Sequence, residues 1–198
     1  MLSKQNSFAD PMKFFSEWLH EAEKKELNDP NAAALSTADE SGYPNVRIVL
    51  IKKANINGFI FFTNLNSQKS MEIQQNKRAA LCFHWKSLER QVRVRGKVEA
   101  VPPDEADEYF ASRPYLSKIG SWASKQSQPL QSNLDLEKNI AYYTAKYVTK
   151  KIPRPEHWSG FRIIPEEIEF WQAGEYRLHK RILFRRDEET WNRSFLYP

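Results

Sequence analysis

The amino-acid sequence predicts a mainly β fold, an antiparallel β-barrel with peripheral helices packed around it. Roughly eight short segments are rich in β-branched and aromatic residues and are separated by turn signals. Long helical stretches are few, and residues 91–101 alternate between apolar and polar side chains, as half-buried antiparallel strands do. We expect a single domain over residues 10–198, preceded by a flexible N-terminal tail over residues 1–9.

The first expected element is a helix that begins at Asp10-Pro11. Asp10 is placed to cap it, and Pro11 suits the first turn, where its missing N–H costs nothing. Apolar residues then follow at helical spacing until Asn28-Asp29-Pro30 ends the run. Residues 32–37 form a short apolar segment that predicts a strand, closed by the turn signal of residues 39–42.

The next segments predict strands around one short helix. Residues 46–52 are apolar on both faces, so we expect a central strand there. Residues 55–58 are a tight-turn signal, and residues 59–63 form the returning strand. We expect a short helix over residues 67–75 and a strand over residues 79–85.

The second half of the chain predicts helices first and strands afterwards. The expected helices cover residues 103–112, 116–123 and 134–147, and residues 150–159 form a proline-rich loop. The expected strands cover residues 161–164, 167–171, 178–186 and 190–195.

Composition excludes several classes of protein. The chain has 198 residues, and its 12 Phe, 8 Tyr and 6 Trp exclude a disordered polymer. The single cysteine, Cys82, excludes an internal disulfide and a cysteine-based zinc cluster, and no spacing indicates a metal site. No apolar run is long enough for a membrane span or a signal peptide, so we expect a cytoplasmic protein. The net charge of +5 fits either nucleic acid or small phosphorylated ligands.

Two groups of residues suggest anion binding near the first strands. Residues 63–69 place hydroxyls, amides and Lys69 where a strand meets a helix N-terminus, which attracts phosphate, although many such junctions are only capped turns. Arg47 and Lys52 lie in an apolar strand and point to opposite faces unless a bulge changes the parity. One strand then serves two anions, or else both charges reach solvent at the strand ends.

Two further groups come from the later segments. Tyr109, Arg113 and Ser117 share one face of a continuous helix and suit a phosphate or carboxylate, but Pro114 makes that helix bend or restart. In a strand, Arg177, His179 and Arg181 lie on one face, where they repel each other unless an anionic ligand lies between them.

In order and spacing, these segments resemble the pyridoxamine 5'-phosphate oxidases, also called pyridoxine/pyridoxamine 5'-phosphate oxidases. The resemblance spans about residues 10–198. It rests on Arg47-Ile-Val-Leu-Ile-Lys52, Gly58-Phe-Ile-Phe-Phe-Thr63-Asn64, Ser67-Gln-Lys69, Arg90-Gln91-Val-Arg-Val-Arg-Gly96, Tyr109-Phe-Ala-Ser-Arg113-Pro, Ser117-Lys-Ile-Gly120, Trp122-Ala-Ser-Lys-Gln126-Ser127, Pro153-Arg-Pro155, Glu169-Phe-Trp171-Gln and Arg177-Leu-His179.

The resemblance implies an antiparallel, FMN-binding split β-barrel that forms a homodimer with FMN at the subunit interface. Such enzymes oxidise pyridoxamine 5'-phosphate or pyridoxine 5'-phosphate to pyridoxal 5'-phosphate. A hydride passes to the flavin, and dioxygen reoxidises it to give hydrogen peroxide. The chemistry belongs to the flavin, and the protein orients the substrate against it.

The resemblance also implies site residues. The implied FMN contacts are Arg47, Ile48, Val49, Leu50, Ile51, Lys52, Phe62, Thr63, Gln68, Lys69, Gln91, Gln126, Ser127, Trp171 and Arg181. The implied substrate contacts are Lys52, Tyr109, Arg113, Ser117, Arg177, Leu178 and His179, of which Arg177 and His179 are the catalytic pair.

The chain departs from the family at a few positions. Gln68 stands where an arginine is usual, Phe62 where a tyrosine is common, and Lys180 where an aspartate is usual. The chain ends in Phe195-Leu-Tyr-Pro198 instead of Arg-Leu-Ala-Pro. These changes weaken FMN binding or alter substrate choice, and none removes an indispensable residue.

Two other functions remain open from the sequence. Another flavoenzyme of the same fold, such as a phenazine-biosynthesis oxidase, keeps the FMN contacts but needs no second phosphate pocket. A basic nucleic-acid-binding barrel predicts strongly salt-dependent binding and no flavin colour. The second phosphate pocket favours the vitamin B6 substrates, so we expect neither nucleic acid nor a membrane as a partner.

Overall fold

The computed structural model describes residues 10–198, and the expected N-terminal tail lies outside the described residues. The helices are α1 (Pro11–Lys25), α2 (Gln68–Asn76), α3 (Pro103–Ser112), α4 (Tyr115–Ala123) and α5 (Asn133–Lys146). The strands are β1 (Ala32–Ala38), β2 (Pro44–Leu50), β3 (Lys53–Asn55), β4 (Gly58–Asn64), β5 (Arg78–Trp85), β6 (Arg90–Ala100), β7 (Trp158–Gln172), β8 (Lys180–Asp187) and β9 (Thr190–Leu196).

All nine strands of the described part belong to one sheet, with the order β2-β1-β5-β6-β7-β4-β3, and β8 and β9 extend it from β7. Every pairing is antiparallel, which confirms the predicted mainly antiparallel β fold. Strands β2 and β3 are consecutive in the chain but lie at opposite ends of this order, so the sheet curls back on itself into a half-barrel.

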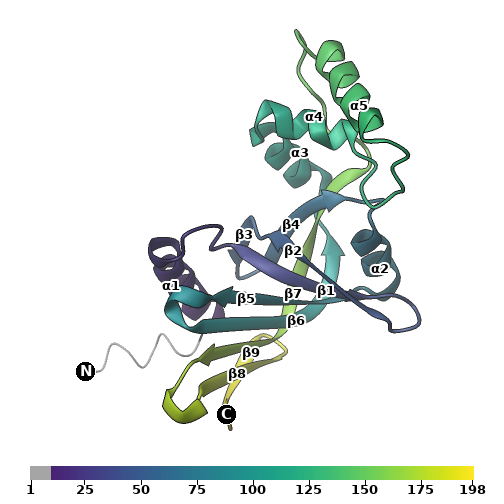
Figure 1. The fold of residues 1–198 in the computed structure, drawn as a ribbon. Helices are drawn as coiled ribbons and strands as arrows, with labels where there is room; N and C mark the ends of the chain where they lie inside the picture. Colours follow the sequence, from purple (N-terminus) through teal and green to yellow (C-terminus); the bar gives the residue numbers. More distant parts are fainter. Residues whose placement is uncertain (1–9) are drawn as a thin grey trace.

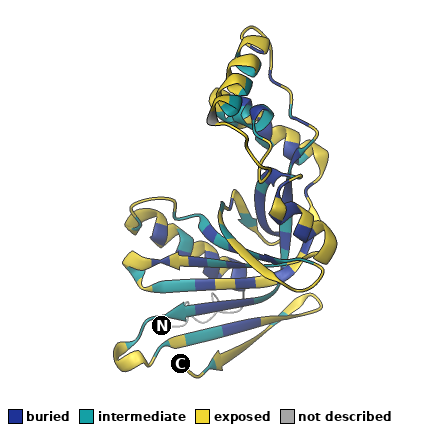
Figure 2. Ribbon diagram, turned by 45° about the vertical axis from the view of Figure 1, so that its right-hand side comes forward, coloured by how far each residue is buried: buried dark blue, intermediate teal, exposed yellow. Residues whose placement is uncertain are grey.

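The core lies inside the curled sheet, and α1 packs against it. The Asp10 carboxylate accepts hydrogen bonds from the backbone N–H of Met12 and Lys13, which caps the helix as predicted. The Phe15 ring, 1% exposed, then contacts the rings of Phe59 and Phe83. Figures 1 and 2 show α3, α4 and α5 together at one end of the molecule and the β8–β9 hairpin at the other, with α5 largely exposed.

Strand β2 differs from the prediction, because it is an edge strand and not a central one. Its one partner in the described chain is β1. Val46 and Ile48 are 64% and 66% exposed, although both are apolar. An apolar strand with an open edge and an exposed face is suited to a surface outside its own chain.

Strand β7 also differs, because the two strands expected over 161–164 and 167–171 form one strand of 15 residues. Pro165 lies opposite Gly96, where the pairing with β6 shifts register. A proline is tolerated at such an irregularity because no ladder hydrogen bond is required from it. Along its other edge, β7 pairs first with β4 and then with β8.

Strand β8 begins at Lys180, so the expected strand face shared by Arg177, His179 and Arg181 is wrong. Arg177 ends a short 3-10 turn over Glu175–Arg177, in which Tyr176 and Arg177 have φ of 55° and 64°. Left-handed backbone does not continue a strand. The group is therefore divided between a turn and a strand.

Candidate active site

A cavity of about 550 Å³ lies between the edge of the sheet and the helices that follow β6. Strands β2 and β4 form one wall, and the end of α3 with the start of α4 forms another. Its lining includes the following predicted site residues: Ile48, Val49, Leu50, Lys52, Phe62, Thr63, Lys69, Tyr109, Arg113, Ser117 and Gln126. Cavities of this size hold small molecules and cofactors.

Lys69 forms one cationic position in the cavity. Its side chain is in the first turn of α2 and is only 8% exposed. The ammonium donates to the hydroxyls of Thr63 at 3.1 Å and Ser67 at 3.0 Å, and no carboxylate within residues 10–198 forms an ion pair with it. Burial, with the nearby charge of Arg47, lowers the pKa of Lys69 to about 8. A buried ammonium beside a helix N-terminus favours a phosphate there.

Arg47 and Gln68 lie differently from Lys69, because both bind Glu72 and neither lines the cavity. Arg47 Nη2 is 3.3 Å from Glu72 Oε2, and Gln68 Nε2 donates to Glu72 Oε1 at 2.9 Å. Burial opposes the Glu72 charge, but hydrogen bonds from Thr37, Gln68 and Asn45 and the charge of Arg47 keep its pKa below the usual value. Glu72 therefore holds two of the expected cofactor residues.

Arg113 forms the second cationic position. It follows α3, and its Nη1 donates to the Ser121 hydroxyl in α4. Its guanidinium carbon lies 4.7 Å from the ring centre of Trp158, and burial lowers its pKa. No carboxylate in the described chain pairs with Arg113, so its charge remains available to an anion in the cavity.

Tyr109, Arg113 and Ser117 meet in this cavity for a reason other than the predicted continuous helix. Helix α3 ends at Ser112 and α4 begins at Tyr115, with Pro114 between them. The chain turns at this break, and all three side chains still line the same cavity. Lys52, which follows the end of β2, lines it too, so the strand-parity argument for Arg47 and Lys52 does not apply.

Trp158 is a cavity residue that the sequence did not indicate. It is 6% exposed, and its ring lies within 9° of parallel to those of Phe62 and Tyr109. Phe62 and Tyr109 themselves stack with ring centres 4.1 Å apart. Trp158 lies within the proline-rich loop expected over residues 150–159, before the expected strand start at residue 161, so no pattern distinguished it.

The remaining expected side chains near this cavity have different surroundings. Gln126 lines the cavity, and its Oε1 accepts from the Thr63 hydroxyl at 3.3 Å. Ser127 has φ of 68° and lines a neighbouring pocket beside α5. Ile51 is 5% exposed and belongs to the core.

A second group of expected residues lies on the outer face of β6, β7 and β8. Gln91, Trp171 and Arg181 are in register across these strands. The His179 ring lies 4.6 Å from the Trp171 ring, and the Gly174 N–H donates to His179 Nδ1 at 3.3 Å. Arg177 and Leu178 occupy the turn before β8.

The two groups are far apart in one chain. Trp158 lines the cavity and Trp171 belongs to the second group, and both lie in β7. They are separated by 171 − 158 = 13 residues. That spacing is roughly 40 Å of strand at the rise of an extended chain. A single chain therefore does not bring the two groups into one site.

The two groups lie in regions of the chain that match two family models. Residues 19–172 match the family described as pyridoxamine 5'-phosphate oxidase. Residues 158–198 match the pyridoxine 5'-phosphate oxidase C-terminal dimerisation region. The chain belongs to the pyridoxamine 5'-phosphate oxidase family. It is therefore an oxidoreductase, and the family resemblance found in the sequence is confirmed.

Relatives agree with this assignment along nearly the whole chain. The pyridoxine/pyridoxamine 5'-phosphate oxidase of Allorhizobium ampelinum is 58% identical over 191 residues, which cover 96% of this chain and 93% of that protein. The crystal structure of PhzG from Burkholderia lata, in complex with tetrahydrophenazine-1-carboxylic acid, has a TM-score of 0.91 and 29% identity and covers 96% of this chain and 93% of that chain.

A more distant structure supports the fold. The pyridoxamine 5'-phosphate oxidase-related, FMN-binding protein of Nostoc punctiforme has a TM-score of 0.76 and 15% identity and covers 93% of this chain and 96% of that chain. The expected split β-barrel fold is confirmed by these neighbours.

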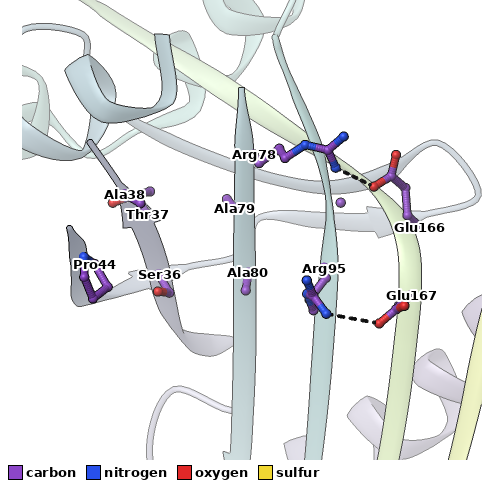
Figure 3. A pocket seen from close by; sticks show the side chains of 11 residues that line it. Ser36, Thr37, Ala38, Pro44, Arg78, Ala79, Ala80, Arg95, Glu166 and Glu167 are labelled. Atoms are coloured by element: carbon purple, nitrogen blue, oxygen red, sulfur yellow. Dashed lines mark hydrogen bonds and ion pairs between the residues drawn. The ribbon is translucent and has the colours of Figure 1, made fainter. Parts of the chain in front are cut away.

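Another pocket of about 270 Å³ lies on the outer face of the sheet, and it contains none of the expected site residues. Figure 3 shows its charged side chains paired with one another. Arg78 binds Glu166 at 3.0 Å, and Arg95 binds Glu167 at 3.5 Å. Because these charges are already paired with each other, this pocket differs from the cavity that contains Lys69 and Arg113, which form no ion pair with a carboxylate of residues 10–198.

Within residues 10–198, no group of three or more His, Cys, Asp or Glu side chains is arranged to hold a metal ion. Among residues 10–198, no helix is both long enough and apolar enough to cross a membrane.

Proposed function

We propose that this chain oxidises pyridoxamine 5'-phosphate and pyridoxine 5'-phosphate to pyridoxal 5'-phosphate, with FMN as cofactor, dioxygen as electron acceptor and hydrogen peroxide as product. The main support for this proposal is that Lys69 and Arg113 line one cavity and that neither forms an ion pair with a carboxylate in the described chain. FMN and the substrate each carry a phosphate, so the reaction requires two such positions. The names of the 58% identical relatives support the same substrates.

The residues around Lys69 fit the FMN phosphate. Lys69 supplies a buried positive charge, and Thr63 and Ser67 supply hydroxyls within 3.1 Å of it. The backbone N–H groups at the start of α2 add to the local positive potential. When bound, FMN supplies the acceptor for two electrons, which dioxygen then removes.

The residues around Arg113 fit the substrate phosphate. Lys52, Tyr109 and Ser117 line the same cavity and add one positive charge and two hydroxyls. Arg113 is held between the Ser121 hydroxyl and the Trp158 ring, so its guanidinium is oriented before substrate binds. Several charge-assisted hydrogen bonds to one phosphate favour phosphorylated vitamers over unphosphorylated ones.

Arg177 and His179 orient the reacting carbon and stabilise charge beside it. The Gly174 N–H donates to His179 Nδ1, so the neutral ring carries its hydrogen on Nε2. Nε2 therefore presents a hydrogen-bond donor to the amino or hydroxyl group of the substrate. Arg177 adds a fixed positive charge from the left-handed turn at the end of Glu175–Arg177.

We infer a homodimer in which each FMN lies at the subunit interface. The two groups of site residues are separated along β7, and the region that carries the second group matches a dimerisation region. Ile48 of edge strand β2 lines the cavity, and this residue and Val46 are exposed apolar side chains that supply a surface for a second copy. Such a dimer places the second group of one protomer against the cavity of its partner.

An aerobic assay tests the proposed reaction. The purified protein, reconstituted with FMN, is given pyridoxamine 5'-phosphate, and pyridoxal 5'-phosphate and hydrogen peroxide are measured together. We expect equal amounts of both products and a much lower kcat/KM for unphosphorylated pyridoxamine. Turnover of tetrahydrophenazine-1-carboxylic acid without turnover of the B6 vitamers instead identifies a phenazine-type oxidase, and a protein that binds no FMN contradicts both assignments.

A further inference from the structure

Two Arg–Glu–Arg groups lie side by side on the outer face of β6, β7 and β8. In the first, Glu169 Oε1 accepts from Arg181 Nε at 2.7 Å, and Glu169 Oε2 lies 3.5 Å from Arg93 Nη1. In the second, Glu167 accepts from Arg185 Nε at 3.2 Å and lies 3.5 Å from Arg95 Nη1. The two glutamates are two residues apart in β7 and therefore point to the same face.

The groups differ in burial. The Glu169 side chain is 7% exposed and that of Arg181 is 26% exposed. The Glu167 side chain is 31% exposed and that of Arg185 is 65% exposed. Exposed ion pairs are weak because water competes for both charges, whereas a buried carboxylate depends on its partners. The Glu169 group is therefore the more rigid of the two.

Arg181 is held at a second point by the end of the chain. Its Nη1 donates to the backbone carbonyl of Tyr197 at 3.0 Å, while its Nε donates to Glu169. Two hydrogen bonds from different nitrogens fix the plane of a guanidinium. The hydrogen bond to Glu169 also raises the pKa of Arg181, which keeps the side chain charged.

We propose that Glu169 is a positioning residue that orients the guanidinium of Arg181 toward the cofactor at the subunit interface. This inference rests on the proposed function, in which Arg181 contacts FMN. Glu169 acts through Arg181 and not by direct contact. Arg181 adjoins Trp171 in register across β7 and β8, so its orientation also shapes the surroundings of that indole.

The test measures FMN affinity of the full-length dimer by quenching of flavin fluorescence during titration of the apoprotein. Glu169→Gln keeps the size of the side chain but removes its charge. We expect FMN to bind about tenfold more weakly, because a misplaced Arg181 loses one charge-assisted hydrogen bond to FMN. Glu167→Gln is the matched control, because it removes the same charge from the neighbouring group (Figure 3). We expect its FMN affinity to stay within about twofold of the unchanged protein.

A double variant separates positioning from a general loss of structure. If Glu169 acts through Arg181, Glu169→Gln has no further effect on FMN affinity in an Arg181→Leu background. The absorption spectrum of bound FMN, which reports its surroundings, is expected to change in the same way in Glu169→Gln and Arg181→Leu. If Glu169→Gln does not fold, Glu169→Asp replaces it, since aspartate keeps the charge but is one methylene too short to reach Arg181.

The outcomes are distinguishable. Unchanged or tighter FMN binding in Glu169→Gln, or an equal loss of affinity with and without Arg181, overturns the positioning role. Weakened binding in Arg181→Leu with unchanged binding in Glu169→Gln overturns it while leaving the proposed function intact. An unchanged protein that binds no FMN overturns the proposed function itself.

Discussion

The guanidinium carbon of Arg113 lies 4.7 Å from the ring centre of Trp158, with the ring of Phe110 at 5.7 Å. Aromatic faces attract a cation without neutralising it. Arg113 is therefore held in place while its charge remains available for a ligand. A carboxylate partner would hold the side chain equally well but would compete with a phosphate.

Arg113→Lys is expected to raise the KM for pyridoxamine 5'-phosphate about tenfold, because lysine keeps the charge but loses the planar, forked donor. FMN affinity is expected to remain unchanged, since Lys69 holds that phosphate in the proposed arrangement. Steady-state kinetics and FMN titration measure the two effects. Arg78→Lys is the control, because Arg78 lies in the outer pocket and pairs with Glu166. An equal change in the control contradicts a specific role for Arg113.

FMN affinity is expected to fall as pH rises through about 8, the value to which burial lowers the pKa of Lys69. A bound phosphate favours the ammonium, so binding above this pH requires uptake of a proton. We expect binding at pH 9 to be weaker than at pH 7 by up to about tenfold. Lys69→Met is expected to bind FMN weakly and to remove this pH dependence, whereas Lys97→Met, at an exposed position, retains it. Equal affinity at both pH values contradicts the prediction.

The same lysine gives a stability prediction of opposite sign. The pKa of Lys69 in the folded apoprotein is about 8, whereas the unfolded chain has the usual value of 10.5. Between these values the unfolded state binds more protons, so the free energy of unfolding rises with pH. Urea unfolding of the apoprotein at pH 8 and pH 10 measures the increase in the free energy of unfolding. The contribution of Lys69 is the difference between this increase in the unchanged protein and in Lys69→Met.

A shared site predicts complementation between two inactive variants. Lys69→Met damages the cavity, and His179→Ala damages the second group. In a heterodimer of the two, one site carries both changes and the other carries neither, so about half of the wild-type activity is expected. Differently tagged chains allow the heterodimer to be purified and assayed. A heterodimer as inactive as its parents contradicts a site built from both protomers.

Two glycines predict opposite effects on stability. A Cβ at Gly96 lies 1.9 Å from the Ile164 carbonyl oxygen, at the register shift opposite Pro165. Gly96→Ala is therefore expected to lower the free energy of unfolding by about 2 kcal/mol or more. A Cβ at Gly120 in α4 meets nothing within 4 Å, so Gly120→Ala is expected to raise it by about 0.5–1 kcal/mol. Thermal unfolding compares both variants, and a stable Gly96→Ala contradicts the close strand approach.

The sequence predicts best where a local pattern determines the element. The alternation over residues 91–101 predicted β6, and Val92, Val94 and Val98 are buried as expected. The prediction fails where the pattern has more than one cause. Residues 46–52 have the composition of a central strand, but β2 is an exposed strand at the edge of the sheet. Hydrophobicity shows that a surface is to be covered, not which chain covers it.

The candidate site shows the same division. The sequence alone indicated the family and the mainly antiparallel β fold and predicted two sets of phosphate-binding side chains, because these depend on residue types at fixed spacings. Only the tertiary structure decided that Arg47 binds Glu72 and that Trp158 supports Arg113. It also decided that the two groups of expected site residues lie toward opposite ends of β7. These contacts join residues that are distant in the chain. They depend on how the whole sheet packs and therefore cannot be predicted from local spacing.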